Sequence, residues 1–507
     1  MRRPRLAPPL AIGLLAAVLA ATPVSAAPPT GGWAAIPSLY PLAGTVIGTT
    51  LGPDGRTYAF GSFINGGGDP TADYLAVFDP VTRDWSGLGS SGQGNGAFGA
   101  TVTGVAFLGS KVIAVGDFID VAGATNIDYF AVWNGSSWST RSAVLGGSPF
   151  TTSIVSVDVL GSDIYVGGQF VNADGVATAD RVARWNGTAW TGLVPGGATD
   201  GSLDGGVFKV DARPDGKVWV GGAFSSAGGD TTASRFAYFD TATGTWHGLR
   251  EAGQAGPAIV PGPQAAVLDF EFSGGRIFVG GTFTDVSGNP AADFVAVWTG
   301  TAWTNLGTNP ANSASGSGPL SAGVWSLVPY GVTMIASGSF RDAGGNANAD
   351  NVAAWNGKAW LNLGVPAPTA SSGQPYGTWA SVNGRVYTHT GFFTSIAGLP
   401  NTAGIAQFGL PGGPTAPLSL AGAPGSGRVS LSWAAPSNSG GSPLLDYVVQ
   451  YRRVGTTTWR TFADGMRTAT TAVVTGLTRG VTYELRVQAV NQWAGGAFTA
   501  PIRKTAG

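Results

Sequence analysis

The sequence predicts an all-β repeat protein, and three observations predict it. A Gly two residues before a Phe, with an Ala thirteen residues after that Phe, recurs seven times along the chain. The Phe anchors are 52 to 59 residues apart, and self-similarity at such a period is the signature of a repeat architecture. Within each repeat, alternating apolar residues lie between turn residues, as is typical of β-strands. The anchors are Phe63, Phe118, Phe170, Phe224, Phe283, Phe340 and Phe393.

One repeat, residues 154–193, shows the expected elements in order. A first alternating run at 154–160 turns at Gly161-Ser162 into a second run, and a loop of fixed length leads to a third. Asn186-Gly187 then precedes the last run, and this dipeptide supplies the positive φ angles that a type I′ hairpin needs. Four short strands in each of seven repeats predict a seven-bladed β-propeller.

The Trp that ends each repeat predicts how the repeats close. Six repeats end in a Trp strand, but the seventh stops after residues 406–408 without one. Near the N-terminus, Trp33 lies in a segment similar to residues 301–306. Because an unpaired edge strand favours aggregation, we expect the strand around Trp33 to complete the seventh blade beside residues 405–408. The closing residues of the other repeats are Trp85, Trp138, Trp190, Trp246, Trp303 and Trp360.

The N-terminal segment, residues 1–26, has the pattern of a signal peptide. Basic residues at positions 2, 3 and 5 precede a short apolar stretch, and small residues at 24–26 suit cleavage. The apolar stretch is too short to span a bilayer, so a secreted, extracellular protein without an anchor is expected. We expect the propeller to occupy residues 27–410, a linker 411–416 and a second domain 417–507.

The second domain resembles a fibronectin type III domain. The residues that carry this resemblance are Trp433, Tyr447, Tyr451, Leu477 and Tyr483. The resemblance implies a β-sandwich with Trp433 in its core and with Tyr483 as the tyrosine corner, whose hydroxyl bonds to upstream backbone. The repeats resemble kelch-type propellers in their Gly-Gly pairs, such as Gly221-Gly222, and in the run at 239–246. That resemblance implies an architecture and not an activity, because propellers host unrelated functions.

Composition excludes several classes of site. The chain has no Cys, only two His, and a net charge of −1 from 27 basic and 28 acidic residues. Thiolate zinc clusters and sites with several His ligands are therefore excluded, and the balanced charge argues against nucleic acid as a partner. No catalytic residue is assigned from the sequence, no cofactor is expected, and a monomer is anticipated.

Candidate binding residues lie in the loops between the second and third strands. An Asp recurs three residues before the repeat Ala, and such a residue commonly caps backbone N–H groups in its own loop. The alternative is calcium bound by these carboxylates and by loop carbonyls. Trp493, in a tip loop of the second domain, is a further candidate. The recurring residues are Asp73, Asp128, Asp180, Asp293 and Asp350.

Two function hypotheses remain open. The first is an exported, non-catalytic binding protein that presents long, replaceable loops, such as 250–266 and 308–323, to an extracellular protein or glycan. In it the type III module is a spacer or a second adhesive domain. The alternative is an extracellular carbohydrate-active protein, a glycoside hydrolase or an accessory component of polysaccharide degradation. It would use acids expected to line a central channel, where paired carboxylates could act on a glycosidic bond. These acids are Asp158, Asp211, Asp269 and Glu271.

Overall fold

The architecture was obtained from a computed structural model of the 507-residue chain. The structure describes the following residues: 32–35, 42, 44–79, 84–92, 94–141, 150–309, 318–330, 333–347, 349–363, 379–382, 385–388, 406–409, 414–437, 439, 444–465, 467–491 and 495–507. Throughout the described residues the regular structure consists of β-strands and short 3-10 turns. None of the described residues forms a helix long and apolar enough to cross a membrane.

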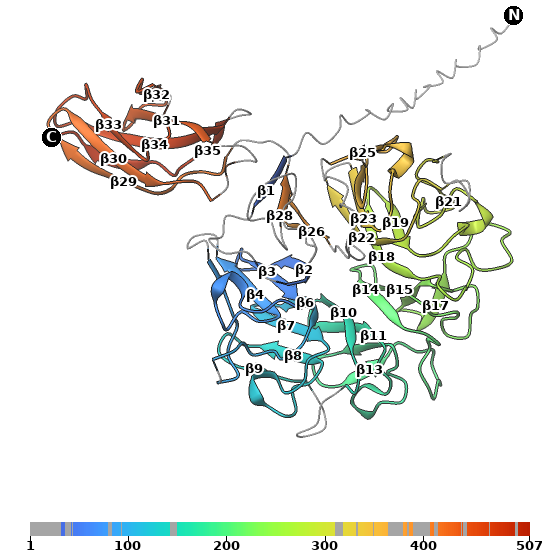
Figure 1. Ribbon diagram of the computed structural model, residues 1–507. Helices are drawn as coiled ribbons and strands as arrows, with labels where there is room; N and C mark the ends of the chain where they lie inside the picture. Colours follow the sequence, from blue (N-terminus) through green and yellow to red (C-terminus); the bar gives the residue numbers. More distant parts are fainter. Residues whose placement is uncertain are drawn as a thin grey trace, which may run out of the picture.

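The described residues of the range 32–409, the repeat region, form seven separate four-stranded antiparallel sheets (Figure 1). Sheet 1 contains β2 (Val46–Leu51), β3 (Thr57–Gly61), β4 (Leu75–Asp79) and β5 (Asp84–Ser86). Sheet 2 contains β6 (Val102–Leu108), β7 (Lys111–Gly116), β8 (Phe130–Trp133) and β9 (Trp138–Ser139). Sheet 3 contains β10 (Ile154–Leu160), β11 (Asp163–Gly168), β12 (Val182–Trp185) and β13 (Trp190–Gly192). Sheet 4 contains β14 (Val207–Ala212), β15 (Lys217–Gly222), β16 (Phe236–Asp240) and β17 (Thr245–Gly248). Sheet 5 contains β18 (Val267–Ser273), β19 (Arg276–Gly281), β20 (Val295–Trp298) and β21 (Trp303–Thr304). Sheet 6 contains β22 (Val324–Tyr330), β23 (Thr333–Gly338), β24 (Val352–Trp355) and β25 (Trp360–Asn362). Sheet 7 contains β26 (Trp379–Val382), β27 (Arg385–Thr388), β28 (Ala406–Gly409) and β1 (Gly32–Ala35).

The repeated Gly, Phe and Ala are explained by the packing inside each sheet. A Cβ atom at Gly222 would lie 2.1 Å from the carbonyl oxygen of Gly206, so only Gly allows the second strand to approach the first this closely. Phe224, two residues later, is fully buried, and so is Ala237 on the third strand. The equivalent Phe and Ala residues of sheets 1 to 6 are buried in the same way. The sequence repeat therefore encodes one sheet and its core.

The repeated Trp residues connect neighbouring sheets. The indole Nε1 of Trp246 donates a hydrogen bond of 2.9 Å to the carbonyl oxygen of Leu193, at the end of the preceding sheet. Trp138, Trp190, Trp303 and Trp360 make the same kind of bond to the preceding sheet, at 2.7 to 3.1 Å. Since a buried indole N–H needs a partner, each bond fixes the spacing between two sheets.

The predicted pairing of the N-terminal strand is present. Strand β1 pairs antiparallel with β28, and Trp33 lies opposite Phe408 in the register. The sheet order β1-β28-β27-β26 thus joins residues from both ends of the repeat region. The first strands of successive sheets also contact one another, from β2 and β6 through to β22 and β26, and β26 contacts β2.

The C-terminal residues form a β-sandwich of two sheets. One sheet contains β29 (Leu418–Gly425), β30 (Arg428–Ala434) and β33 (Thr471–Val474). The other contains β31 (Leu444–Arg453), β32 (Arg460–Thr461), β34 (Thr482–Asn491), β35 (Gly495–Phe498) and β36 (Ile502–Thr505). Trp433 is buried between the sheets, with its ring centroid 5.3 Å from that of Tyr447. The hydroxyl of Tyr483 accepts a hydrogen bond of 3.0 Å from the backbone N–H of Thr478, as expected of a tyrosine corner.

The fold class predicted from the sequence needs a correction. The all-β class, the four-stranded unit and the C-terminal sandwich are as expected. The described strands form separate antiparallel sheets, none of which closes on itself into a barrel, and the predicted seven-bladed, kelch-like propeller is not supported. The repeated residues specify the inside of a sheet and its contact with the next one. They do not specify a fold family, so we describe the repeat region only by its seven sheets.

Candidate functional site in the repeat region

A cavity of about 980 Å³ lies between the first strands of sheets 1 to 6. In each of these six strands a β-bulge interrupts the pairing with the second strand after the first residue. The extra residue at each bulge lines the cavity, which agrees with the tendency of bulges to redirect a side chain. These bulge residues are Ile47, Thr103, Val155, Phe208, Leu268 and Trp325.

One side of the cavity wall is charged. Lys209 on β14 extends to β18, where its Nζ lies 2.6 Å from Asp269 Oδ1 and 2.8 Å from Glu271 Oε1. The other carboxylate oxygen of Asp269 accepts a 2.6 Å hydrogen bond from the backbone N–H of Leu327 on β22. Asp158 Oδ2 on β10 accepts one of 2.7 Å from the N–H of Ala212. These contacts join the first strands of sheets 3 to 6 to one another.

Burial and charge shift the pKa values in this cluster. Burial disfavours the charged form of Lys209, but the charges of Asp269 and Glu271 outweigh this effect, and the pKa of Lys209 is raised. Burial raises the pKa of Glu271 despite its contact with Lys209. The pKa of Asp211 is also raised, first by burial and then by the negative charge of Asp158. The four acids expected to line a channel therefore do line this cavity, together with a Lys that the sequence analysis did not single out.

The five recurring Asp residues lie in the loops between the second and third strands. In each loop, Oδ1 of the Asp accepts a hydrogen bond from the backbone N–H eight residues earlier, at 2.5 to 2.9 Å. Those N–H groups belong to Asn65, Asp120, Asn172, Asp285 and Asp342. The carboxylates therefore close their own loops, as in the turn-capping interpretation.

These loops are further fixed at the residue that follows the Asp. Tyr74, for example, has a φ angle of 62°, and its N–H donates a 2.8 Å hydrogen bond to the carbonyl oxygen of Phe63. The equivalent residues in sheets 2 to 6 also have φ angles of 60° to 64° and the same bond to the anchor Phe. A bulky residue adopts this conformation only where its surroundings impose it, so the loops are rigid.

Three of these rigid loops present an exposed aliphatic side chain at the same position, directly after the buried Phe. Ile64, Ile119 and Val171 are 50%, 55% and 41% exposed, in the consecutive sheets 1, 2 and 3. We call them the aliphatic triplet. In sheets 4 to 6 the equivalent residues are Ser225, Thr284 and Arg341. The three loops that carry the triplet, residues 62–74, 117–129 and 169–181, contain seven Asp and one Arg. The triplet is visible in the sequence when the repeats are aligned at this position, whereas the recurring Asp does not reveal it.

The long connections between sheets differ from what the sequence suggested. Residues 250–266 and 308–323 were expected to be replaceable, yet Ile259 and Leu320 are buried and belong to the hydrophobic cores that contain Trp303 and Trp360. Phe98 fills the same role in an earlier connection, with its ring centroid 4.9 Å from that of Trp138. The connections thus contribute to the core, and their replacement by Gly-Ser turns would leave cavities beside the Trp residues.

Two of the predicted binding features have no support from the structure. Trp493 lies outside the described residues. Within the described part of the chain, no group of three or more His, Cys, Asp or Glu residues is arranged to hold a metal ion. The calcium hypothesis therefore rests on the sequence alone.

Comparisons with known proteins match part of the chain. A family model for the fibronectin type III domain matches residues 414–505. Human myomesin-2 is 38% identical over 63 residues, which are 12% of this chain and 4% of the length of that protein. Among solved structures, a set of titin domains is 22% identical, with a TM-score of 0.18, and covers 24% of this chain and 39% of the titin chain. A domain of Drosophila Lar is 21% identical, with a TM-score of 0.16, and covers 18% of this chain and 96% of its own.

The family match confirms one expectation from the sequence, the C-terminal fibronectin type III domain, and gives no support to a kelch-type propeller. The family match agrees with the buried Trp433 and with the hydrogen bond of Tyr483. Residues 414–505 of this multidomain, all-β chain are therefore a fibronectin type III domain.

Proposed function

We propose that this chain is a non-catalytic interaction protein that binds a protein partner through the aliphatic triplet. Exposed apolar surface marks interaction sites when it exceeds that of singly scattered side chains. Ile64, Ile119 and Val171 occupy one repeat position on three neighbouring sheets, and this regularity is the observation that carries the proposal. The type III domain acts as a spacer or as a second adhesive module, and residues 1–26 direct the protein out of the cell.

The loops around the triplet indicate the chemistry of the partner. They carry seven Asp against one Arg, and Asp117 and Asp120 are exposed on either side of Ile119. A complementary surface would place aliphatic side chains between Lys or Arg residues. Because each loop is closed by its own Asp, little conformational entropy is lost when a partner binds.

The test replaces the triplet with the residue that the chain itself uses in sheet 4. Peptides selected from a random library with the protein lacking residues 1–26 should be rich in aliphatic and basic residues. The triple variant Ile64→Ser, Ile119→Ser, Val171→Ser should bind these peptides at least about tenfold more weakly, since three apolar contacts are removed. Its thermal unfolding should hardly change, because surface substitutions of this kind alter stability little.

The matched control is Thr284→Ser, the same position in sheet 5. It should bind the selected peptides as the unaltered protein does. If the triple variant also bound them unchanged, or if the selection yielded peptides without aliphatic and basic residues, the triplet would not be the binding site.

A second candidate function, glycoside hydrolysis, is favoured by one observation. Asp211 and Glu271, two carboxyl groups with raised pKa values, line the same cavity, and a general acid in such an enzyme needs a raised pKa. This candidate would be established if the unaltered protein released reducing sugar from a polysaccharide and neither Asp211→Asn nor Glu271→Gln did so. Release that is unchanged in these variants, or undetectable in the unaltered protein, would remove it.

A further inference from the structure

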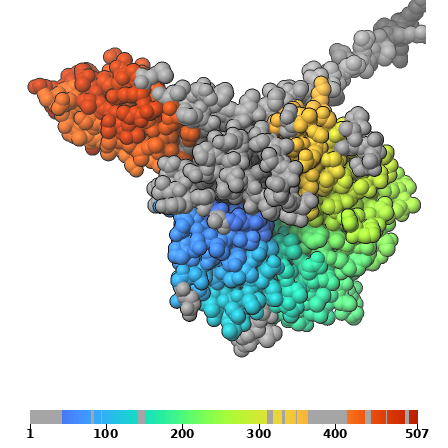
Figure 2. All heavy atoms as spheres, viewed as in Figure 1, coloured from blue at the N-terminus to red at the C-terminus, as the bar shows by residue number. Residues whose placement is uncertain are grey.

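The type III domain is positively charged, although the chain as a whole is close to neutral. Residues 414–507 contain 9 Lys and Arg against 3 Asp and Glu, a formal charge of +6, although the complete chain has a net charge of −1. In Figure 2 the orange and red atoms of this domain form a lobe distinct from the blue-to-yellow atoms of the repeat region. A domain with this positive charge attracts anions.

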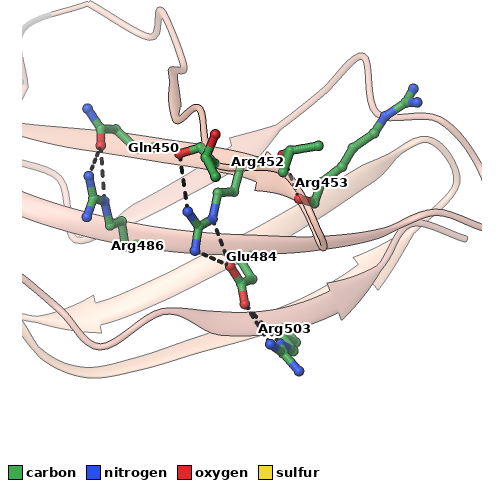
Figure 3. A network of polar contacts seen from close by, with 8 residues as sticks. Gln450, Arg452, Arg453, Glu484, Arg486 and Arg503 are labelled. Atoms are coloured by element: carbon green, nitrogen blue, oxygen red, sulfur yellow. Dashed lines mark hydrogen bonds and ion pairs between the residues drawn. The ribbon is translucent and has the colours of Figure 1, made fainter.

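Three of the Arg residues stand on one face of the five-stranded sheet (Figure 3). In the strand register, Arg452 on β31 lies opposite Glu484 on β34, and Glu484 lies opposite Arg503 on β36. Glu484 accepts hydrogen bonds from both, with Oε2 at 2.8 Å from Arg452 Nε and Oε1 at 2.9 Å from Arg503 Nη2. One carboxylate therefore holds two guanidinium groups whose strands are about 10 Å apart.

The third, Arg486, is held by neutral groups. Its guanidinium carbon lies 4.1 Å from the ring centroid of Trp459 and 3.9 Å from that of Phe498. Its Nε and Nη2 both donate to Gln450 Oε1, at 3.1 and 2.7 Å. Among the described residues, no carboxylate lies within ion-pairing distance of it. Burial lowers the pKa of Arg486, and the neighbouring charge of Arg452 lowers it further.

This arrangement prepares Arg486 for an oxyanion. Two rings lie over the guanidinium group, so the remaining N–H groups are available at its edge. Arg binds planar carboxylates and sulfates in this edge-on manner, with two parallel hydrogen bonds. Because Trp459 and Gln450 already fix the side chain, the entropy lost on binding is small.

We propose that this face, formed by Arg452, Trp459, Arg486, Phe498 and Arg503, binds an acidic polysaccharide. Arg452 and Arg503 lie on either side of Glu484, and Arg486 is diagonal to both, so the cations are about 7 to 10 Å apart. A polysaccharide with one carboxylate or sulfate per sugar ring has sparse charges of this kind. Aromatic rings between the cations add apolar surface against which sugar rings can pack. The proposal is independent of the aliphatic triplet, which lies in the repeat region.

Other polyanions fit the molecule less well. Duplex nucleic acid carries a charge about every 1.7 Å along its axis, a much denser array than the cations on this face. An extended acidic peptide turns successive side chains to opposite sides, so only every second carboxylate would face the sheet, and it has no sugar rings to pack against Trp459 and Phe498.

The experiment measures binding of the complete protein, without residues 1–26, to polygalacturonate and to dextran sulfate at low ionic strength, with neutral dextran as the blank. Binding should weaken as salt is added, since screening reduces such contacts. Arg486→Gln and Arg503→Gln should each weaken binding about tenfold, the loss of one charge-assisted pair of hydrogen bonds. Arg503 is 68% exposed, so its substitution tests the proposal without disturbing the core.

The matched control is Arg428→Gln, which removes the same charge from an exposed position on the other sheet. At about 0.15 M salt it should change binding by no more than about twofold, because a distant surface charge is then largely screened. Equal losses in Arg428→Gln and Arg486→Gln would reduce the effect to net charge and overturn the proposal. Failure of the unaltered protein to bind either polysaccharide, or equal binding of poly-glutamate or single-stranded DNA, would also overturn it.

Discussion

The repeat region and the type III domain carry opposite charges and use them differently. Residues 6–413 have a formal charge of −10 and residues 414–507 a formal charge of +6. In the repeat region many carboxylates serve the fold: Asp269 binds Lys209 and two backbone N–H groups, and Asp73 closes its own loop. In the type III domain the guanidinium groups of Arg452 and Arg486 stack on the ring of Trp459. The difference indicates that charged groups mainly stabilise the fold in the repeat region, whereas in the type III domain they form a cationic surface.

The comparison also changes what the composition of the chain can exclude. A net charge of −1 argued against nucleic acid as a partner when the chain was treated as a whole. That average combines an acidic part with a basic domain, and each part meets a partner through its own surface. Electrostatic arguments about partners therefore have to be made for each domain separately.

The largest effect is expected where a charge inside the repeat region loses its partner. Lys209→Met should lower the free energy of unfolding of the repeat region by roughly 3–5 kcal/mol, because Asp269 and Glu271 would be left as unpaired charges in the cavity wall. Denaturant unfolding followed by tryptophan fluorescence measures this change. The stability of the type III domain should not respond.

Lys217→Met, on the neighbouring strand β15, is the matched control. Lys217 lies 3.6 Å from the exposed Asp215, and such surface pairs contribute about 0–1 kcal/mol. If the two variants unfolded at the same denaturant concentration, Lys209 would not be what holds β14 and β18 together, and the proposed division between structural and surface charges would fail.

Much of the local structure could be predicted because it depends on residues close in sequence. Gly222, Phe224 and Ala237 mark strands whose packing allows few other residues, and Tyr483 marks the tyrosine corner. The pairing of β1 with β28 followed from a missing Trp strand and the segment around Trp33. The predicted kelch-like family could not be derived in this way, because a sequence repeat describes its structural unit and not a relationship to other proteins.

The residues of the candidate sites were harder to predict. The bulge residues share a backbone position but not a residue type, so no motif identifies Phe208 or Trp325. The contact of Lys209 with Asp269 joins positions 60 residues apart in different sheets. Arg486 is distinguished by the rings that cover it, and Trp459 is close to it only in the folded sheet. Such arrangements depend on tertiary contacts that a linear pattern does not contain.

The smallest expected effect is a difference in the pH dependence of the two parts. A carboxyl group whose pKa is raised in the folded protein, as for Asp211, disfavours folding while it is ionised. Acidification from pH 7 towards the ordinary Asp value of about 4 should therefore relieve this penalty in the repeat region. The hydrogen bonds from Arg503 and Arg452 lower the pKa of Glu484, so its contribution to the type III domain persists until the pH falls below about 4 and is then lost.

Thermal unfolding at pH 7, 5.5 and 4 separates these opposite trends. Asp211→Asn should raise the melting temperature of the repeat region slightly at pH 7 and reduce its gain on acidification, because Asp158 and Lys209 then face a neutral group. Asp215→Asn, at an exposed position of the β14–β15 turn, should change neither value. A repeat region that loses stability between pH 7 and 5.5 in the unaltered protein, or an Asp211→Asn variant with an unchanged pH profile, would show that the cavity acids do not oppose folding. The contrast with Glu484 would then reduce to the lowered pKa of a single ion-paired carboxylate, whose loss of stabilisation is confined to strongly acidic solution.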